Sequence, residues 1–248
     1  MTPFEESFRV RGYETDLRRH APIARLCDYA QEAAGNHATA LGLGIRQLMD
    51  ANGTSWMLSR VHVKILKPVG WGETVRVRTW PAGVSKYILC TRDAVGLDEK
   101  GETAFEYVSE WFVVDLAALK VVRPPAEYVA LASEGVPRVA LAATPGGAKF
   151  RALEKVDATS RILVRRADHD FNEHVNNVHY MSWALEAVPE EFRARDVREM
   201  DIVFRLAAHA GDELEVRTER VDAVTLRHEI VRLADNARLV TAETKWSA

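Results

Sequence analysis

The feature that most constrains the fold of this chain is an internal repeat. A shift of 154 positions sets residues 10–34, VRGYETDLRRHAPIARLCDYAQEAA, against residues 164–188, VRRADHDFNEHVNNVHYMSWALEAV, without a gap. The identities under this shift include Arg11, Asp16, His20, Ala30, Glu32 and Ala33 with Arg165, Asp170, His174, Ala184, Glu186 and Ala187. A shift of 139 positions then sets GETVRVRT (72–79) against GDELEVRT (211–218). Self-similarity at a fixed spacing indicates one structural unit that occurs twice.

Each copy is expected to contain a strand, a helix and then a run of strands. Pro22, apolar residues at helical spacing and Gly42 predict a helix over 20–42, and the second copy predicts one over 175–192. β-branched and aromatic runs predict strands near the N-terminus and over 55–68, 73–84, 86–98, 103–122, 160–170, 198–208, 212–222, 225–235 and 238–247. Several Pro and Gly residues indicate a connector over 123–149.

The short connections between the strands favour antiparallel pairing. A helix that is apolar over much of its surface must be covered, and an antiparallel sheet curled around it does so. That arrangement is the hotdog fold. We therefore predict an α+β chain with a double hotdog, divided into residues 1–135 and residues 136–248.

The composition is that of an ordinary globular protein, with 47% hydrophobic residues, 28% charged residues and a formal net charge of −3. No basic excess points to nucleic acid. Cys27 and Cys90 fit no metal-ligand spacing, so we expect two reduced thiols. No apolar run approaches the roughly 18 residues that a membrane span needs, and MTPFEESFRVRGYETD lacks the apolar core of a signal peptide. We expect a cytoplasmic protein with no membrane partner.

The segment 170–186, DFNEHVNNVHYMSWALE, crowds polar side chains at the start of the second predicted helix. It resembles the signature of the acyl-acyl-carrier-protein (acyl-ACP) thioesterases, as do FRVRGYETD, NHATALGLG and PVGWGETVRVRTW in the first copy. The resemblance covers nearly the whole chain. It implies a double hotdog that hydrolyses the thioester between a fatty acyl chain and the phosphopantetheine arm of acyl carrier protein (ACP).

The resemblance also implies the catalytic residues Asp170, Asn172 and His174. Thioester hydrolysis needs a positioned water, a group that takes its proton, and donors for the developing oxyanion. His174 suits the water or its proton, Asn172 suits the carbonyl or the water, and Asp170 suits orientation of both or the role of base. Substrate contacts are expected at Asn176 and Asn177, where N–H groups at a helix start can stabilise negative charge.

The chain departs from the family pattern on the strand after this helix. Family members carry a Glu there, and plant members a Cys, at the positions of Ala207 and Ala208. Three interpretations follow: Asp170 or His174 is the base without further help, a neighbour such as His209 substitutes, or the activity is altered. We favour the first of these.

The first copy has lost the amides of the motif, because Arg18 stands for Asn172, and Pro22 and Ile23 stand for the two asparagines. We therefore expect residues 1–135 to bind the acyl chain and residues 136–248 to hold the catalytic site. The small residues Ala30 and Ala34 on the first helix and Trp56 on the next strand are the candidate acyl contacts, although such residues are more often plain core.

The expected partner is ACP with its phosphopantetheine-linked acyl chain, and the chain is expected to be a monomer or a homodimer. The eight histidines show no ligand spacing and no glycine-rich phosphate loop is present, so neither a metal nor a cofactor is expected. Three alternatives remain open: an acyl-CoA thioesterase, a hotdog dehydratase or hydratase, and a non-catalytic acyl-thioester-binding protein.

Overall fold

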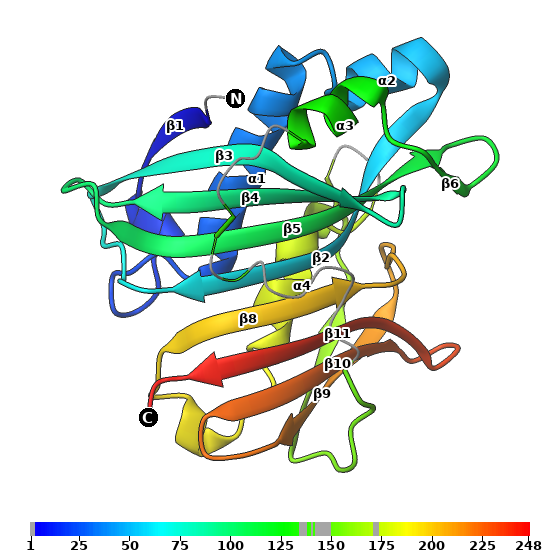
Figure 1. Cartoon of the computed structure of the whole chain (residues 1–248). Helices are drawn as coiled ribbons and strands as arrows, with labels where there is room; N and C mark the ends of the chain where they lie inside the picture. The colour runs from blue at the N-terminus through cyan, green and yellow to red at the C-terminus, as the bar shows by residue number, and fades with distance from the viewer. Residues whose placement is uncertain (1–2, 134–137, 140, 142–149, 171–173) are drawn as a thin grey trace. The chain divides into compact units, whose positions relative to one another are not determined.

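The computed structural model describes residues 3–133, 138–139, 141, 150–170 and 174–248. The chain divides into two compact units, Met1–Gly147 and Ala148–Ala248. The predicted boundary between residues 135 and 136 lies outside the described residues. The predicted α+β class and the double hotdog are confirmed (Figure 1).

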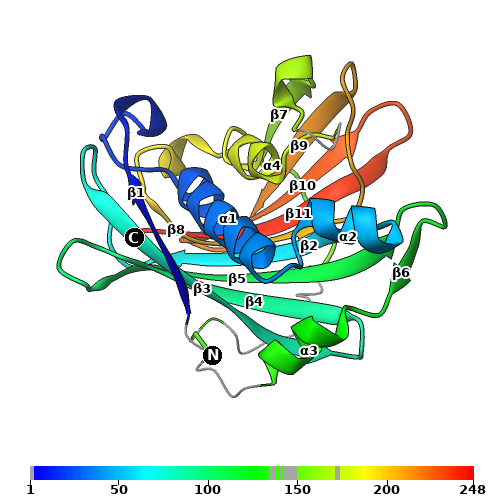
Figure 2. The same ribbon diagram turned by 90° about the horizontal axis from the view of Figure 1, so that it is seen from above.

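The first unit is an antiparallel sheet with a long helix on one face (Figure 2). Its strands pair in the order β1-β3-β4-β5-β2. The short strand β6 pairs with the last three residues of β5, along the edge opposite to β2. The elements are β1 (Phe4–Arg9), a 3-10 turn (Gly12–Glu14), α1 (Ile23–Ala40), α2 (Ile45–Asn52), β2 (Thr54–Ile65), β3 (Thr74–Ser85), β4 (Leu89–Leu97), β5 (Thr103–Asp115), β6 (Lys120–Val122) and α3 (Ala126–Ala132).

Helix α1 is held in place by its buried small and apolar residues. Leu26, Cys27, Ala30 and Ala33 are completely buried, and the helix packs on strands of this sheet. Pro22 was expected in the first turn of this helix, but it adopts an extended conformation as the N-cap, and the helix begins at Ile23. A helix with such a buried face draws its stability from tertiary packing more than from propensity.

The predicted connector contains a helix that the sequence did not indicate. Helix α3 buries Tyr128, whose hydroxyl donates to the carbonyl of Thr91 at 2.8 Å. Tyr128 packs with Leu43, Leu48 and Cys90 in one cluster. The helix has only seven residues between a proline pair and a loop, too few for a periodic pattern to stand out.

The second unit repeats this plan with a much shorter helix. Its strands pair antiparallel in the order β8-β11-β10-β9-β7, and α4 packs against β9 and β10. The elements are β7 (Ala158–Leu163), a 3-10 turn (Arg166–Asp168), α4 (Asn177–Ala184), a second 3-10 turn (Glu190–Phe192), β8 (Val197–Phe204), β9 (Glu213–Arg220), β10 (Thr225–Arg232) and β11 (Ala237–Trp246).

Helix α4 is shorter than the predicted stretch 175–192. It has eight residues, and Leu185 caps it in the structure. Pro189 excludes a helix that continues to residue 192 as predicted, because proline lacks the N–H for a helical bond and restricts the residue before it. The predicted strand over 160–170 likewise ends at Leu163, where the chain enters the 3-10 turn.

Among the described residues, none of the helices is both long and apolar enough to cross a lipid bilayer. Cys27 and Cys90 are free and buried, as two reduced thiols require. Burial raises the pKa of the Cys90 thiol to about 12, and it raises the pKa of the Cys27 thiol well above its ordinary value. Neither thiol is therefore a reactive thiolate at neutral pH.

Candidate active site

The loop that leads into α4 carries the predicted catalytic motif. The backbone N–H of Asp170 donates to the carbonyl of His174 at 3.0 Å, and His169 forms an antiparallel bridge with Val175. The side chain of Asp170 is half-buried and that of His174 is exposed. The structure thus brings Asp170 and His174 together at the two ends of one closed loop, while Asn172 lies outside the described residues.

A buried carboxylate beneath this loop anchors it. Asp168 accepts the backbone N–H of Arg165 at 2.7 Å and Nη2 of Arg165 at 2.8 Å, and its carbonyl accepts the N–H of Asn176 at 3.0 Å. Burial opposes ionisation of Asp168, but the hydrogen bonds and charge of Arg165 outweigh it, so the pKa of Asp168 lies below its ordinary value. Asp168 was not among the site residues predicted from the sequence, although its partner Arg165 is identical to Arg11 in the internal repeat.

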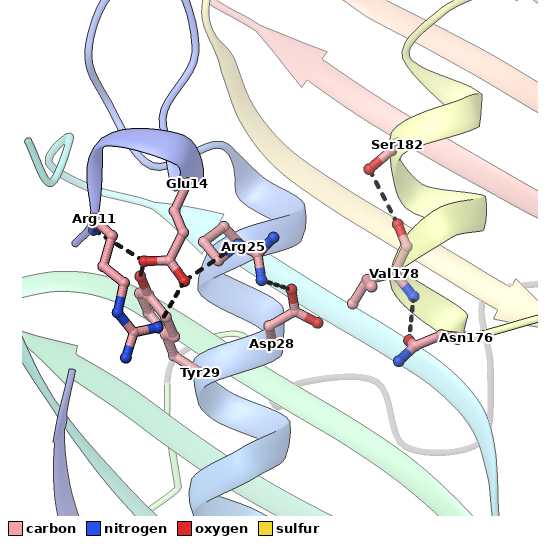
Figure 3. Close-up of polar contacts among 8 residues, drawn as sticks. All are labelled: Arg11, Glu14, Arg25, Asp28, Tyr29, Asn176, Val178 and Ser182. Carbon is pink, nitrogen blue, oxygen red and sulfur yellow. Dashed lines mark hydrogen bonds and ion pairs between the residues drawn. The ribbon is translucent and has the colours of Figure 1, made fainter. Parts of the chain in front are cut away.

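The two predicted substrate contacts, Asn176 and Asn177, lie at the start of α4, and Asn176 caps this helix. Asn176 is the N-cap of α4, and its side-chain oxygen accepts the N–H of Val178 at 3.1 Å (Figure 3). Its carbonyl accepts the N–H of His179 at 3.0 Å. Two of the N–H groups that open the helix are therefore bonded to Asn176. Asn177 is the first helical residue and is half-buried.

The segment after β8 lies against the motif loop. The carbonyl of Ala208 accepts the N–H of Val175 at 3.5 Å, and the N–H of Ala208 donates to the hydroxyl of Tyr180 at 2.7 Å. Ala207 is exposed and Ala208 is buried. These two positions contribute only methyl groups next to the loop.

His209 follows these alanines and lies beside His174. The two imidazole rings have centroids 5.4 Å apart and planes inclined by 51°. The N–H of His209 donates to Oδ2 of Asp212 at 2.9 Å, which fixes the turn that carries the ring. The side chain of His209 is exposed.

The candidate acyl contacts in the first unit fall into two groups. Ala30 is completely buried on α1, and Ala34 is 7% exposed. Trp56 is half-buried on β2, donates its Nε1–H to the carbonyl of Leu43 at 2.8 Å and packs on Tyr128. The apolar cluster that contains Trp56 includes neither Ala30 nor Ala34.

The interior of the first unit also contains a polar group that the sequence analysis missed. Nη1 of Arg92 lies 3.1 Å from Nδ1 of His37 and 3.3 Å from Oγ1 of Thr79, and all three residues are buried. Burial, together with the charge of Arg92, lowers the pKa of His37 to about 4. His37 is therefore neutral at pH 7 and can accept from the guanidinium. No sequence pattern marked this pairing, because the two residues lie far apart in the chain.

The first unit has a buried carboxylate at the position that corresponds to Asp168. Glu14 accepts the N–H of Arg11 at 2.9 Å and the hydroxyl of Tyr29 at 2.7 Å, and Arg25 lies between Glu14 and Asp28 (Figure 3). Burial opposes ionisation of Glu14, but these bonds outweigh it and hold its pKa below the ordinary value. Burial raises the pKa of Asp28 to about 6 despite its ion pair with Arg25.

Among the residues that the structure describes, no group of three or more His, Cys, Asp or Glu side chains is placed to hold a metal ion. The polar groups around the motif loop are imidazoles, carboxylates and amides. Such groups can position a water molecule, accept its proton and stabilise an oxyanion.

Two family models match the chain. The acyl-ACP thioesterase N-terminal domain matches residues 2–132, and the acyl-ACP thioesterase C-terminal domain matches residues 152–248. Together the two matches include the motif loop, the anchor Asp168 and the candidate acyl contacts.

Curated relatives and solved structures agree with these matches. An acyl-acyl-carrier-protein hydrolase of Cuphea viscosissima is 26% identical over 98% of this chain and 62% of its own length. Oleoyl-acyl carrier protein thioesterase 1 of Arabidopsis thaliana is 30% identical over 81% of this chain and 58% of its own. The structure of the 12:0-ACP thioesterase from Umbellularia californica covers 99% of this chain and 97% of its own, with 23% identity and a TM-score of 0.85. The chain thus spans about three-fifths of the length of these curated relatives.

The cytoplasmic location expected from the N-terminal segment is contradicted by the relatives. Those from Cuphea viscosissima and Arabidopsis thaliana are named chloroplastic. The expectation relied on the lack of an apolar signal-peptide core. That argument bears only on secretion, and other addresses have different compositions.

The resemblance seen in the motif is confirmed by matches that extend over both units. Both family domains occur in order, and they cover more than half of the residues. The chain belongs to the acyl-ACP thioesterase family.

Proposed function

We propose that this chain is a thioester hydrolase that cleaves fatty acyl-ACP into a free fatty acid and holo-ACP. The observation that carries the proposal is the closed loop before α4, where the Asp170 N–H bonds to the His174 carbonyl and the two motif side chains flank one short segment. Membership of the family supports the same activity.

In the proposed reaction a water molecule attacks the thioester carbonyl. Asp170 and His174 orient this water, Asn172 holds the carbonyl or the water through its amide, and helix-start N–H groups near Asn177 stabilise the oxyanion. The carbon–sulfur bond then breaks, and the phosphopantetheine sulfur leaves as a thiol. We assign the acyl chain to residues 1–135, with Ala30, Ala34 and Trp56 as contacts, and catalysis to residues 136–248.

Ala30 and Ala34 support the assignment of the acyl chain to the first unit, because their small side chains take up little volume on the buried face of α1. The half-buried Trp56 is the weaker candidate, since its ring already packs on Tyr128 and bonds to Leu43. The polar pair of His37 and Arg92 limits how far a purely apolar pocket extends in this unit.

The deciding experiment is a thiol-release assay of the purified chain with acyl-ACP thioesters from short to long chains and with matched acyl-CoA. We expect hydrolysis of acyl-ACP with a higher kcat/KM than of acyl-CoA. Asp170→Asn should abolish release, whereas Asp16→Asn, at the corresponding position of the first unit, should not. A reversed carrier preference would favour an acyl-CoA thioesterase. Release of thiol from no substrate at any length would leave only an acyl-binding role.

A further inference from the structure

The repeat defines which residues face each other across the motif loop. In the first unit, His20 forms an antiparallel bridge with Gly70. Under the two shifts, His20 corresponds to His174 (20 + 154) and Gly70 to His209 (70 + 139). The pair His174 and His209 therefore occupies the positions that the first unit joins by a bridge.

Backbone contacts around these positions are the same in the two units. The N–H of Gly70 donates to Oε2 of Glu73 at 2.7 Å, as the N–H of His209 donates to Oδ2 of Asp212 at 2.9 Å. One residue earlier, the carbonyl of Val69 accepts the N–H of Ala21 at 2.9 Å, as that of Ala208 accepts from Val175 at 3.5 Å. The turn that carries His209 is thus a defined part of the fold.

Residues opposite each other in an antiparallel pair project their side chains to the same side, with Cβ atoms about 5 Å apart. The ring centroids of His174 and His209 lie 5.4 Å apart, so the two imidazoles are neighbours on one side of the chain. Gly70 has no side chain, so the first unit has one imidazole at this place and the second has two. The second imidazole is exposed and next to a motif residue, and no fold requirement accounts for it.

We propose that His209 is a further catalytic residue of this chain, the general base that takes the proton of the attacking water while His174 positions that water. This inference rests on the proposed hydrolase function. The water oxygen bonds to the thioester carbon and its proton passes to the His209 ring. The carbon–sulfur bond then breaks, and the protonated ring gives the same proton to the departing sulfur. His209 returns to its neutral form, so no other reactant is needed.

The groups around His209 suit this role. His174 lies on one side, and Asp212 accepts the His209 N–H while Arg232 lies 3.5 Å from the same carboxylate. Tyr180 holds the adjacent Ala208 N–H. Ala207 and Ala208 add no proton acceptor, whereas His209 of the same segment places an imidazole beside the His174 ring of the loop.

The test compares His209→Gln, which keeps a polar side chain without a basic nitrogen, with His209→Gly, which recreates the residue of the first unit. We expect kcat/KM for acyl-ACP to fall about 100- to 1000-fold in both variants, with KM changed less than about twofold. Imidazole added to the buffer should restore His209→Gly by about tenfold or more, because a free ring can occupy the vacated space and accept the proton. The control, His20→Gln, should keep wild-type activity.

The outcomes separate the two proposals. If wild-type protein is active and His209→Gln keeps about half or more of its kcat/KM, the inference is wrong and the hydrolase function stands. If wild-type protein releases no thiol, the proposed function fails and takes the inference with it. Should His209→Gln not fold by circular dichroism, rescue of His209→Gly by imidazole decides, and lack of rescue in a folded His209→Gly overturns the inference.

Discussion

The two units share a backbone frame and differ in the side chains that they attach to it. In both, a buried carboxylate caps the N–H of an arginine three residues earlier, Glu14 with Arg11 and Asp168 with Arg165. In both, an aspartate N–H closes a loop onto a histidine carbonyl, at 2.9 Å in the first unit and 3.0 Å in the second. These hydrogen bonds thus occur in both units, whether or not a unit has the catalytic motif. A catalytic role depends instead on which side chains stand at the equivalent positions.

The helices show the same separation of frame and content. Both begin after an N-cap at equivalent positions, Pro22 and Asn176. Helix α1 then continues for 18 residues with buried alanines, whereas α4 stops after eight and buries Tyr180, Met181 and Trp183. Helix α1 thus has several small side chains on its buried face, where α4 has large ones. This difference supports our proposal that the first unit binds the acyl chain.

The largest difference between the units is expected at the equivalent residues His174 and His20. His174→Ala should lower kcat/KM for acyl-ACP by about 1000-fold, because the ring that positions the attacking water is lost. His20→Ala, at the equivalent position, should change it less than about twofold. Steady-state thiol release measures both. Equal losses in the two variants would mean that the first unit also holds a working site.

The buried carboxylates should matter for folding in both units. Glu14→Ala removes the acceptor of the Arg11 N–H and the Tyr29 hydroxyl, and Asp168→Ala removes that of the Arg165 N–H. Each leaves a donor without its partner and should lower the free energy of unfolding by about 2–3 kcal/mol. Urea unfolding followed by circular dichroism gives the values. We expect the larger loss for Glu14→Ala, because the buried Tyr29 hydroxyl is left without an acceptor, whereas the exposed guanidinium of Arg165 can bond to water instead. The reverse order would contradict the role assigned to the Tyr29 hydroxyl.

The smallest expected effect on stability is that of Asp28, and it depends on pH. The second unit has Ser182 at the equivalent position, which does not ionise. The pKa of Asp28 is raised to about 6 in the folded chain, above the ordinary 3.8. A raised pKa contributes stability that is fully present below about pH 4 and is lost as the pH rises through about 6. Since the side chain is 27% exposed, we expect Asp28→Asn to remove about 1–2 kcal/mol of that loss at pH 8. Thermal unfolding of the wild type and of Asp28→Asn at pH 4 and pH 8 measures this effect. The same stability difference between the two proteins at both pH values would contradict the raised pKa.

Much of the fold was predictable because it depends on local periodicity. The repeat, the strands and helix α1 follow from residue spacing, and both termini of α1 lie within three residues of the prediction. Helix α3 and the early end of α4 were not predictable from periodicity, because the first is short and the second is decided by Pro189 and by packing. Asp170 and His174 stood out through the motif, whereas Asp168 did not, because no sequence pattern marks the hydrogen bonds that it accepts from the N–H and the guanidinium of Arg165.

The sequence by itself determined the repeat and the hotdog class, because both follow from residue spacing along the chain. It also indicated the family and the residues of the motif, through the resemblance of that motif to the family signature. Only the tertiary structure decided that His209 lies beside His174, that Arg92 bonds to a neutral His37, and that Asp28 is buried enough for its pKa to rise. The physical reason is common to all three. Cross-strand contact and desolvation arise from segments distant in sequence, and no local pattern records which segments will meet.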